Sequence, residues 1–168
     1  EEADSVGGVT ETVICGVPAG VGEPWFDSVE SVISHAVFSL GGVKGVEFGA
    51  GFAAADMKGS ECNDPLRVSG GRRVATTNNN GGINGGITNG MPIVFRCAVK
   101  PTPSIAQTQD TVDFIKNENT QLSIHGRHDP AIIRRICPVL DSVAALCVAD
   151  MLSLRYGTDV LTKGVDDK

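Results

Sequence analysis

The stretch Ile-Val-Phe-Arg-Cys-Ala-Val, residues 93–99, alternates along the chain as a half-buried β-strand does. Its apolar side chains point to one face because successive residues of a strand face opposite ways. That face carries Ile93, Phe95, Cys97 and Val99. A Gly/Asn-rich segment comes before this strand and a proline-rich segment follows it, so both ends of the strand are marked.

Two long amphipathic helices are predicted on either side of this strand. In residues 26–40, apolar residues recur at helical spacing, and Asp27 or Ser28 can serve as the N-cap. Residues 130–154 carry a second apolar stripe. There Asp129 is expected as N-cap and Pro130 as the first helical residue. Pro138 lies inside this helix and predicts a kink or a break.

Strands occur between and around these helices. Residues 9–15 and 43–48 are predicted as strands, residues 52–57 as a resumption of extended structure and residues 121–125 as a weak strand. Residues 107–116 are predicted as an irregular helix, and residues 58–90 as a long polar loop region. Because strands and long helices alternate in mixed order, the pattern predicts an α+β fold.

The composition excludes several classes of function. The formal net charge is −6, and no cluster of Lys and Arg suits a nucleic-acid backbone. No apolar run approaches the roughly 20 residues that span a bilayer. The five cysteines are widely spaced without a C-x-x-C pair, which argues against a zinc ribbon and favours a reducing compartment. We therefore expect no nucleic-acid, membrane or metal partner.

Residues 78–90, Asn-Asn-Asn-Gly-Gly-Ile-Asn-Gly-Gly-Ile-Thr-Asn-Gly, form the first candidate binding segment. Glycine allows positive φ angles and a close approach of backbone amides to a ligand. Such a loop suits a flat polar ring or a phosphate, while its composition alone favours a low-complexity surface loop. Two isoleucines between the Gly-Gly pairs indicate packing rather than a random linker.

Two further segments carry charge next to predicted element ends. Residues 99–105 place Lys100 and two hydroxyls on a proline-stiffened loop, which suits an anion unless the loop simply ends in solvent. Residues 125–130 place Arg127, His128 and Asp129 before a helix. In one interpretation Asp129 caps the helix and His128 is an exposed loop residue. In the other, Arg127 is a ligand clamp and Asp129 an acid–base group or a flavin partner.

Taken in order, these segments resemble the chorismate synthase family. Residues 16–24 are similar to its GVPxGxGEP turn, and residues 43–52 to its VKGVEIGxGF segment. Residues 78–90 resemble its NxGGIxGGIxxG loop, residues 100–105 its KPTxSI motif and residues 126–130 its GRHDP motif. The resemblance covers residues 4–154, and five ordered motifs make coincidence an inadequate explanation.

The resemblance implies a lyase of the shikimate pathway of aromatic amino-acid biosynthesis. The family converts 5-enolpyruvylshikimate 3-phosphate to chorismate and phosphate by a 1,4-anti elimination that requires reduced FMN, and it is also associated with NADP. It further implies a cytoplasmic homotetramer with a layered β-α-β sandwich fold, in which long helices lie between antiparallel sheets.

The resemblance also assigns site residues. Asp129 would assist proton transfer at the reactive flavin nitrogen, and the FMN site would be lined by Gly41, Gly42, Gly85, Lys100, Pro101, Thr102, Pro103, Ser104 and Arg127. Two departures stand out. Gly41-Gly42 stands where the family more often has Asn-Ala. The segment of residues 58–77 is longer than its usual counterpart in the family.

Residues 1–168 resemble only the carboxy-terminal part of the family, with residues 58–90 as an active-site loop region. No counterpart of the family's catalytic histidines, Arg-Ser-Ser flavin contact or substrate arginines occurs in the sequence. We therefore expect the missing amino-terminal half as a partner, and no chorismate synthase activity from this chain alone. The alternative is a non-catalytic fragment that binds FMN or phosphate.

Overall fold

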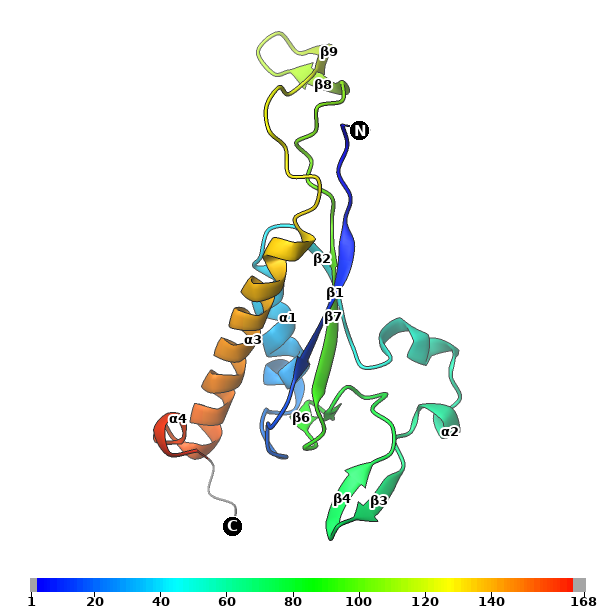
Figure 1. Ribbon diagram of the computed structural model, residues 1–168, viewed down its shortest axis with the longest axis vertical. Helices are drawn as coiled ribbons and strands as arrows, with labels where there is room; N and C mark the ends of the chain where they lie inside the picture. Colours follow the sequence, from blue (N-terminus) through cyan, green and yellow to red (C-terminus); the bar gives the residue numbers. More distant parts are fainter. Residues whose placement is uncertain (1–2, 165–168) are drawn as a thin grey trace.

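The computed structural model describes residues 3–164 and has an α+β fold, as predicted (Figure 1). Its centre is a three-stranded antiparallel sheet in the order β1-β7-β2. These strands are β1 (Gly8–Ile14), β2 (Val43–Phe48) and β7 (Ile93–Val99). All three were expected as strands, β1 and β7 from period-2 alternation, and β2 and β7 with these bounds.

Only one face of this sheet packs against helices. Phe95 and Cys97 of β7 are fully buried there, while Arg96 between them lies on the other face and pairs with Glu47. On β1 the buried side chains are Thr10 and Thr12, and the neighbouring valines face outward. Polar residues on the inner face are tolerated partly because the Thr12 hydroxyl donates to the Asp141 carboxylate at 3.3 Å.

Two helices cover the inner face (Figure 1): α1 (Val29–Phe38) and α3 (Ile133–Tyr156), which pack against each other. Ser28 caps α1 by accepting a hydrogen bond from the Ser31 amide at 3.1 Å. The short 3-10 helix η1 (Trp25–Asp27) comes before it, so residue 26, where the helix was predicted to begin, lies outside α1. The core joins α1 through Ile33, α3 through Leu140 and β7 through Phe95.

The start of α3 differs from the prediction. The helix begins at Ile133, and its N-cap Ile132 has no side-chain cap. Asp129 therefore does not cap α3, and Pro130 is not its first residue. The Asp129 carboxylate instead accepts from the Ala131 amide at 3.4 Å and forms an ion pair with Arg135 at 3.1 Å. The helix also continues through Pro138 without a break, because a proline removes only one backbone donor.

Two expected elements are wrong. Residues 52–57 are not extended but belong to the 3-10 helix η2 (Gly51–Asp56). Residues 107–116 contain the strand β8 (Gln109–Asp113) rather than a helix, and it pairs with β9 (Glu118–Leu122). A tight turn decides this, since Asn117 has a φ of 55° and the Asp113 carboxylate accepts from the Ile115 and Lys116 amides.

Residues 58–90 are more structured than predicted. They contain the helix α2 (Gly59–Cys62), the hairpin of β3 (Leu66–Ser69) and β4 (Arg72–Ala75), and the short pair β5 (Ile83–Asn84) and β6 (Ile87–Thr88). The β3–β4 and β8–β9 hairpins project from opposite ends of the molecule (Figure 1). The short helix α4 (Val160–Lys163) follows α3.

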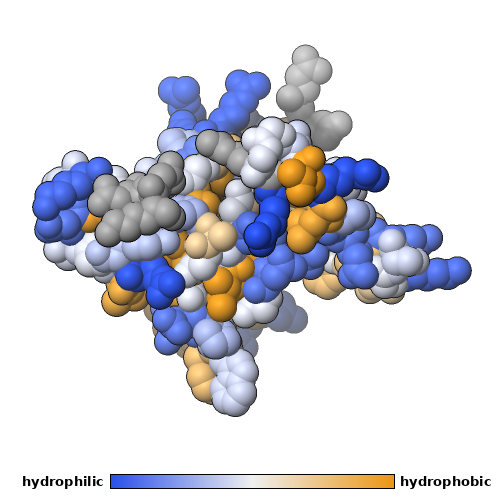
Figure 2. Space-filling view, turned by 90° about the horizontal axis from the view of Figure 1, so that it is seen from below, coloured by the Kyte–Doolittle hydropathy of each residue, from blue (hydrophilic) through white to orange (hydrophobic). Residues whose placement is uncertain are grey.

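The outer surface of α3 carries apolar side chains that nothing among residues 3–164 covers. Leu146 is 71% exposed and Leu154 is 80% exposed. By length and composition α3 could cross a membrane, but a core helix passes the same test, and its other side is buried against the sheet. At the end of the molecule shown in Figure 2, apolar patches are small and separated by hydrophilic residues.

Leu140 and Leu146 offer a matched test of this packing. Leu140 is fully buried and Leu146 is mostly exposed on the same helix. Leu140→Ala should lower the free energy of unfolding by about 3 kcal/mol, because it leaves a cavity in the core. Leu146→Ala should change it by less than about 0.5 kcal/mol. Urea denaturation followed by circular dichroism measures both, and equal losses would contradict this arrangement.

Candidate functional site

The end of β7 and the start of β2 bring two predicted binding segments together. The Lys100 amide donates to the Gly42 carbonyl at 2.9 Å, so Gly41 and Gly42 lie next to the segment from Lys100 to Ser104. Gly42 has a φ of 99°, and a Cβ there would lie 3.2 Å from Ile132. The positive φ angle favours glycine at this crossing, and a Cβ would require only a small shift of the Ile132 side chain.

The segment before α3 joins the same end of the sheet. The Val6 amide donates to the Pro130 carbonyl at 2.8 Å, and the Ser104 hydroxyl lies 3.0 Å from Nδ1 of His128. The Ser5 hydroxyl also donates to the Thr102 carbonyl at 2.6 Å. Arg127 and Asp129 are therefore carried to the end of β7 that bears Lys100.

Several polar groups of this cluster lack partners. The side chains of Lys100 and Arg127 are exposed, and neither forms an ion pair within the described part of the chain. The Thr102 hydroxyl is buried and has no hydrogen-bond partner among residues 3–164. Buried polar atoms in proteins are nearly always bonded, so an orphaned hydroxyl on a segment that also carries an exposed lysine is compatible with an anionic, hydrogen-bonding ligand.

Gly85 does not lie in this cluster. It belongs to the turn between β5 and β6, and the neighbouring Gly86 carbonyl accepts from the amide of Val29, the first residue of α1. Gly41 and Gly42 instead follow the C-terminal end of α1, and Lys100 follows the C-terminal end of β7, whereas Gly85 comes before the start of β7. Seven strand residues separate the two ends by about 20 Å. Within one chain, the structure thus brings together every predicted cofactor residue except Gly85.

The Asn/Gly loop is held by a residue that the sequence did not single out, Asp64. One oxygen of its carboxylate accepts from the Thr77 hydroxyl and the Asn79 amide, both at 2.7 Å. The other accepts from the Asn80 amide at 3.0 Å and its side-chain nitrogen at 2.8 Å. Partial burial opposes ionisation of Asp64, but these hydrogen bonds outweigh it and lower the pKa of the carboxyl. The signal that could have found Asp64 is an acidic residue before proline at the edge of a hairpin.

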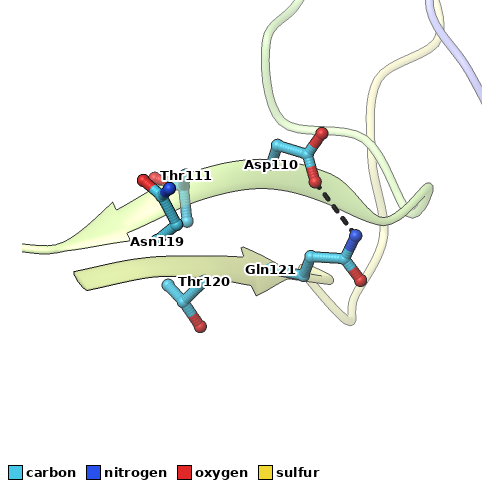
Figure 3. A pocket seen from close by; sticks show the side chains of 5 residues that line it. All are labelled: Asp110, Thr111, Asn119, Thr120 and Gln121. Atoms are coloured by element: carbon cyan, nitrogen blue, oxygen red, sulfur yellow. Dashed lines mark hydrogen bonds between the residues drawn. The ribbon is translucent and has the colours of Figure 1, made fainter.

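Two cavities lie away from the Lys100 cluster. One, of about 790 Å³, separates the β3–β4 hairpin from the Asn/Gly loop, and its polar lining includes Asp64, Arg73, Asn80, Asn84 and Asn89. The other, of about 520 Å³, lies on the β8–β9 hairpin, where Gln121 donates to Asp110 at 2.9 Å (Figure 3). Neither cavity contains any of the clustered residues.

Comparison with known proteins agrees with these motifs. The family model described as chorismate synthase matches residues 1–153. The chain belongs to the chorismate synthase family. A chorismate synthase of Methanosarcina acetivorans is 52% identical over 157 residues, which are 94% of this chain and 43% of that protein. One from Chitinophaga pinensis is 54% identical over 160 residues, or 95% of this chain and 48% of that protein.

A solved structure agrees with the sequence relatives. A crystal structure of chorismate synthase superposes with a TM-score of 0.74 at 33% identity, and the match covers 93% of this chain and 40% of that one. The chain therefore spans less than half the length of the chorismate synthases that it matches. The family resemblance and the α+β fold expected from the sequence are both confirmed.

Asp64 provides a test of how the Asn/Gly loop of this chorismate synthase segment is held. Asp64→Asn replaces one of the two acceptor oxygens with an NH2 group that faces two donors, and it should lower the free energy of unfolding by about 2 kcal/mol at pH 7. Because the folded-state pKa is lowered, this stabilisation is present above the pKa of the unfolded carboxyl and is lost as pH falls through the folded value. The difference from the unsubstituted chain should therefore vanish in acid.

Chemical denaturation at pH 7 and at stepwise lower pH measures this effect. Asp56→Asn is the matched control, since Asp56 is exposed at the end of η2 and should change the free energy of unfolding by less than about 0.5 kcal/mol. A loss on Asp64→Asn that stayed constant down to acid pH would show that the charge of Asp64 does not hold the loop.

Proposed function

We propose that the family-length protein containing this segment converts 5-enolpyruvylshikimate 3-phosphate to chorismate and phosphate by 1,4-anti elimination. The proposal rests on family membership together with one observation of the site. Lys100, Thr102 and Arg127 converge at one end of the sheet with no partner among residues 3–164 for either charge or for the buried hydroxyl. Groups in this state favour a bound anion, as an FMN-dependent lyase acting on a phosphate ester requires.

The residues present fit FMN. Lys100 and Arg127 would supply positive charge, the Thr102 and Ser104 hydroxyls would supply hydrogen bonds, and Gly41 and Gly42 would let the cofactor approach the backbone. Pro101 and Pro103 would stiffen the segment. Reduced FMN, when bound, supplies transient electron density while phosphate leaves, without net redox change.

Asp129 is proposed to assist proton transfer at the cofactor. Its ion pair with Arg135 and its bond from the Ala131 amide orient the carboxylate without closing every acceptor position. Gly85 lies too far away to contact the same flavin within one chain. If it contributes, it does so from another copy of the chain, and a homotetramer is proposed here on the resemblance alone.

The isolated chain is proposed to be inactive. It spans less than half of its relatives, and the resemblance places the catalytic histidines and substrate arginines in the missing amino-terminal half. The uncovered leucines of α3 favour such a partner, because exposed apolar side chains on a core helix lack the layer that would bury them. A cytoplasmic location and an association with NADP follow from the family.

A second candidate is a non-catalytic fragment that binds FMN or phosphate. The observation that favours it is that the Lys100 cluster is assembled from residues of this chain alone. Both candidates predict that FMN binds, and they differ in whether chorismate is formed.

FMN titration of the chain, followed by flavin fluorescence, tests the site. Lys100→Met and Arg127→Met should each weaken binding by about 10- to 100-fold, the loss expected for a charge-assisted hydrogen bond. Lys116→Met, in the exposed β8–β9 turn, is the matched control and should leave the affinity unchanged. Equal affinities for all three variants would contradict an FMN site here.

Turnover separates the two candidates. With 5-enolpyruvylshikimate 3-phosphate and reduced FMN supplied anaerobically, the family-length protein should release phosphate and form chorismate, whereas residues 1–168 alone should not. Chorismate formation by the isolated chain would contradict the proposed need for the missing half. Failure of an active-site-intact family-length protein to form chorismate would refute the proposed reaction.

A further inference from the structure

The hydrogen bonds of His128 fix which of its ring nitrogens carries the proton. Nε2 lies 2.8 Å from the Ile124 carbonyl, which can only accept, so Nε2 must be the donor. In a neutral imidazole the other nitrogen is then an acceptor. Nδ1, 3.0 Å from the Ser104 hydroxyl, therefore accepts a hydrogen bond from that hydroxyl.

The direction of the Ser104–His128 hydrogen bond decides whether Ser104 can donate to an anion. While Ser104 donates to His128, its hydroxyl offers only lone pairs to any other group, and lone pairs do not bind an anionic oxygen. If His128 takes up a proton from solvent, Nδ1 becomes a donor to the Ser104 oxygen. The Ser104 proton is then free to be donated to a ligand, and the ring adds a positive charge beside Lys100 and Arg127.

We propose that binding of a phosphate group at Ser104, which under the proposed function is that of FMN, is coupled to uptake of one proton by His128, which reverses the Ser104–His128 hydrogen bond. The coupling rests on the proposed FMN site. Because linkage is reciprocal, the anion favours protonated His128, and protonated His128 favours the anion. His128 thereby acts as a positioning residue that sets the donor state of Ser104.

The surroundings of His128 are compatible with a cationic ring. On its own loop the neighbouring charges are Arg127 and Asp129, and Asp129 is shared with Arg135 of α3. On the facing loop the charge is Lys100, and His125 lies three residues earlier in the chain. A bound anion would offset the repulsion between a protonated ring and these two cations.

Isothermal titration of FMN into the chain, in two buffers with different heats of ionisation, measures the protons taken up. His128→Gln is the matched variant, since an amide can donate to the Ile124 carbonyl and accept from Ser104 but cannot titrate. The FMN phosphate has its own ionisation, with a pKa of about 6, and this contributes equally to both proteins. The unsubstituted chain should take up more protons than His128→Gln.

The affinity should show the same coupling. Between pH 6 and pH 8 the unsubstituted chain should lose affinity more steeply than His128→Gln, by up to about tenfold per pH unit. Ser104→Ala should also remove the extra proton uptake. Equal uptake in the unsubstituted chain and His128→Gln, or full uptake in Ser104→Ala, would overturn the proposal.

A measurement without flavin separates this proposal from the proposed function. Nitrogen-15 NMR of the imidazoles, assigned with His128→Gln, should show the Nε2–H tautomer in the free chain. Inorganic phosphate should raise the protonated fraction of His128, and chloride at equal ionic strength should not. A chain that fails to bind FMN but shows this response refutes the cofactor site alone, whereas an Nδ1–H tautomer or no response to phosphate overturns the coupling.

Discussion

The position of β7 between β1 and β2 is the constraint on which the rest of this structure depends. Its two ladders fix the register of the sheet, and its buried face receives α1 and α3. Because β7 runs directly from the Asn/Gly loop to Lys100, it separates two candidate functional segments by the length of one strand. The crossing of Lys100 over Gly42 then extends the β2–β7 ladder into the candidate site.

The two ends of β7 differ in how well their polar groups are satisfied. At the Asn/Gly end, Asp64 gathers four donors and ties the loop to the hairpin beside it. At the Lys100 end, the Thr102 hydroxyl is buried without a partner in the described chain, and the Ser104 hydroxyl lies 3.0 Å from Nδ1 of His128. Satisfied hydrogen bonds stabilise a conformation, whereas an unsatisfied buried polar atom is compatible with a ligand.

The helix layer indicates that the chain is one part of a larger unit. α1 and α3 bury one side against the sheet, and α3 leaves Leu146 and Leu154 exposed on its other side. In a layered fold such a surface is covered by a further layer. This agrees with a chain that spans less than half of the related chorismate synthases.

The sequence by itself determined the family, the α+β class and the strands β2 and β7, because alternation of period 2 and ordered motifs are local properties. It also narrowed the N-cap of α1 to Asp27 or Ser28, of which the structure shows Ser28. Only the tertiary structure decided that residues 109–122 form a hairpin, that α3 begins at Ile133, and that Asp129 pairs with Arg135 instead of capping. It alone separated Gly85 from Lys100 and brought Ser104 to His128, because distances between segments are set by sheet register and helix packing, which no local pattern encodes.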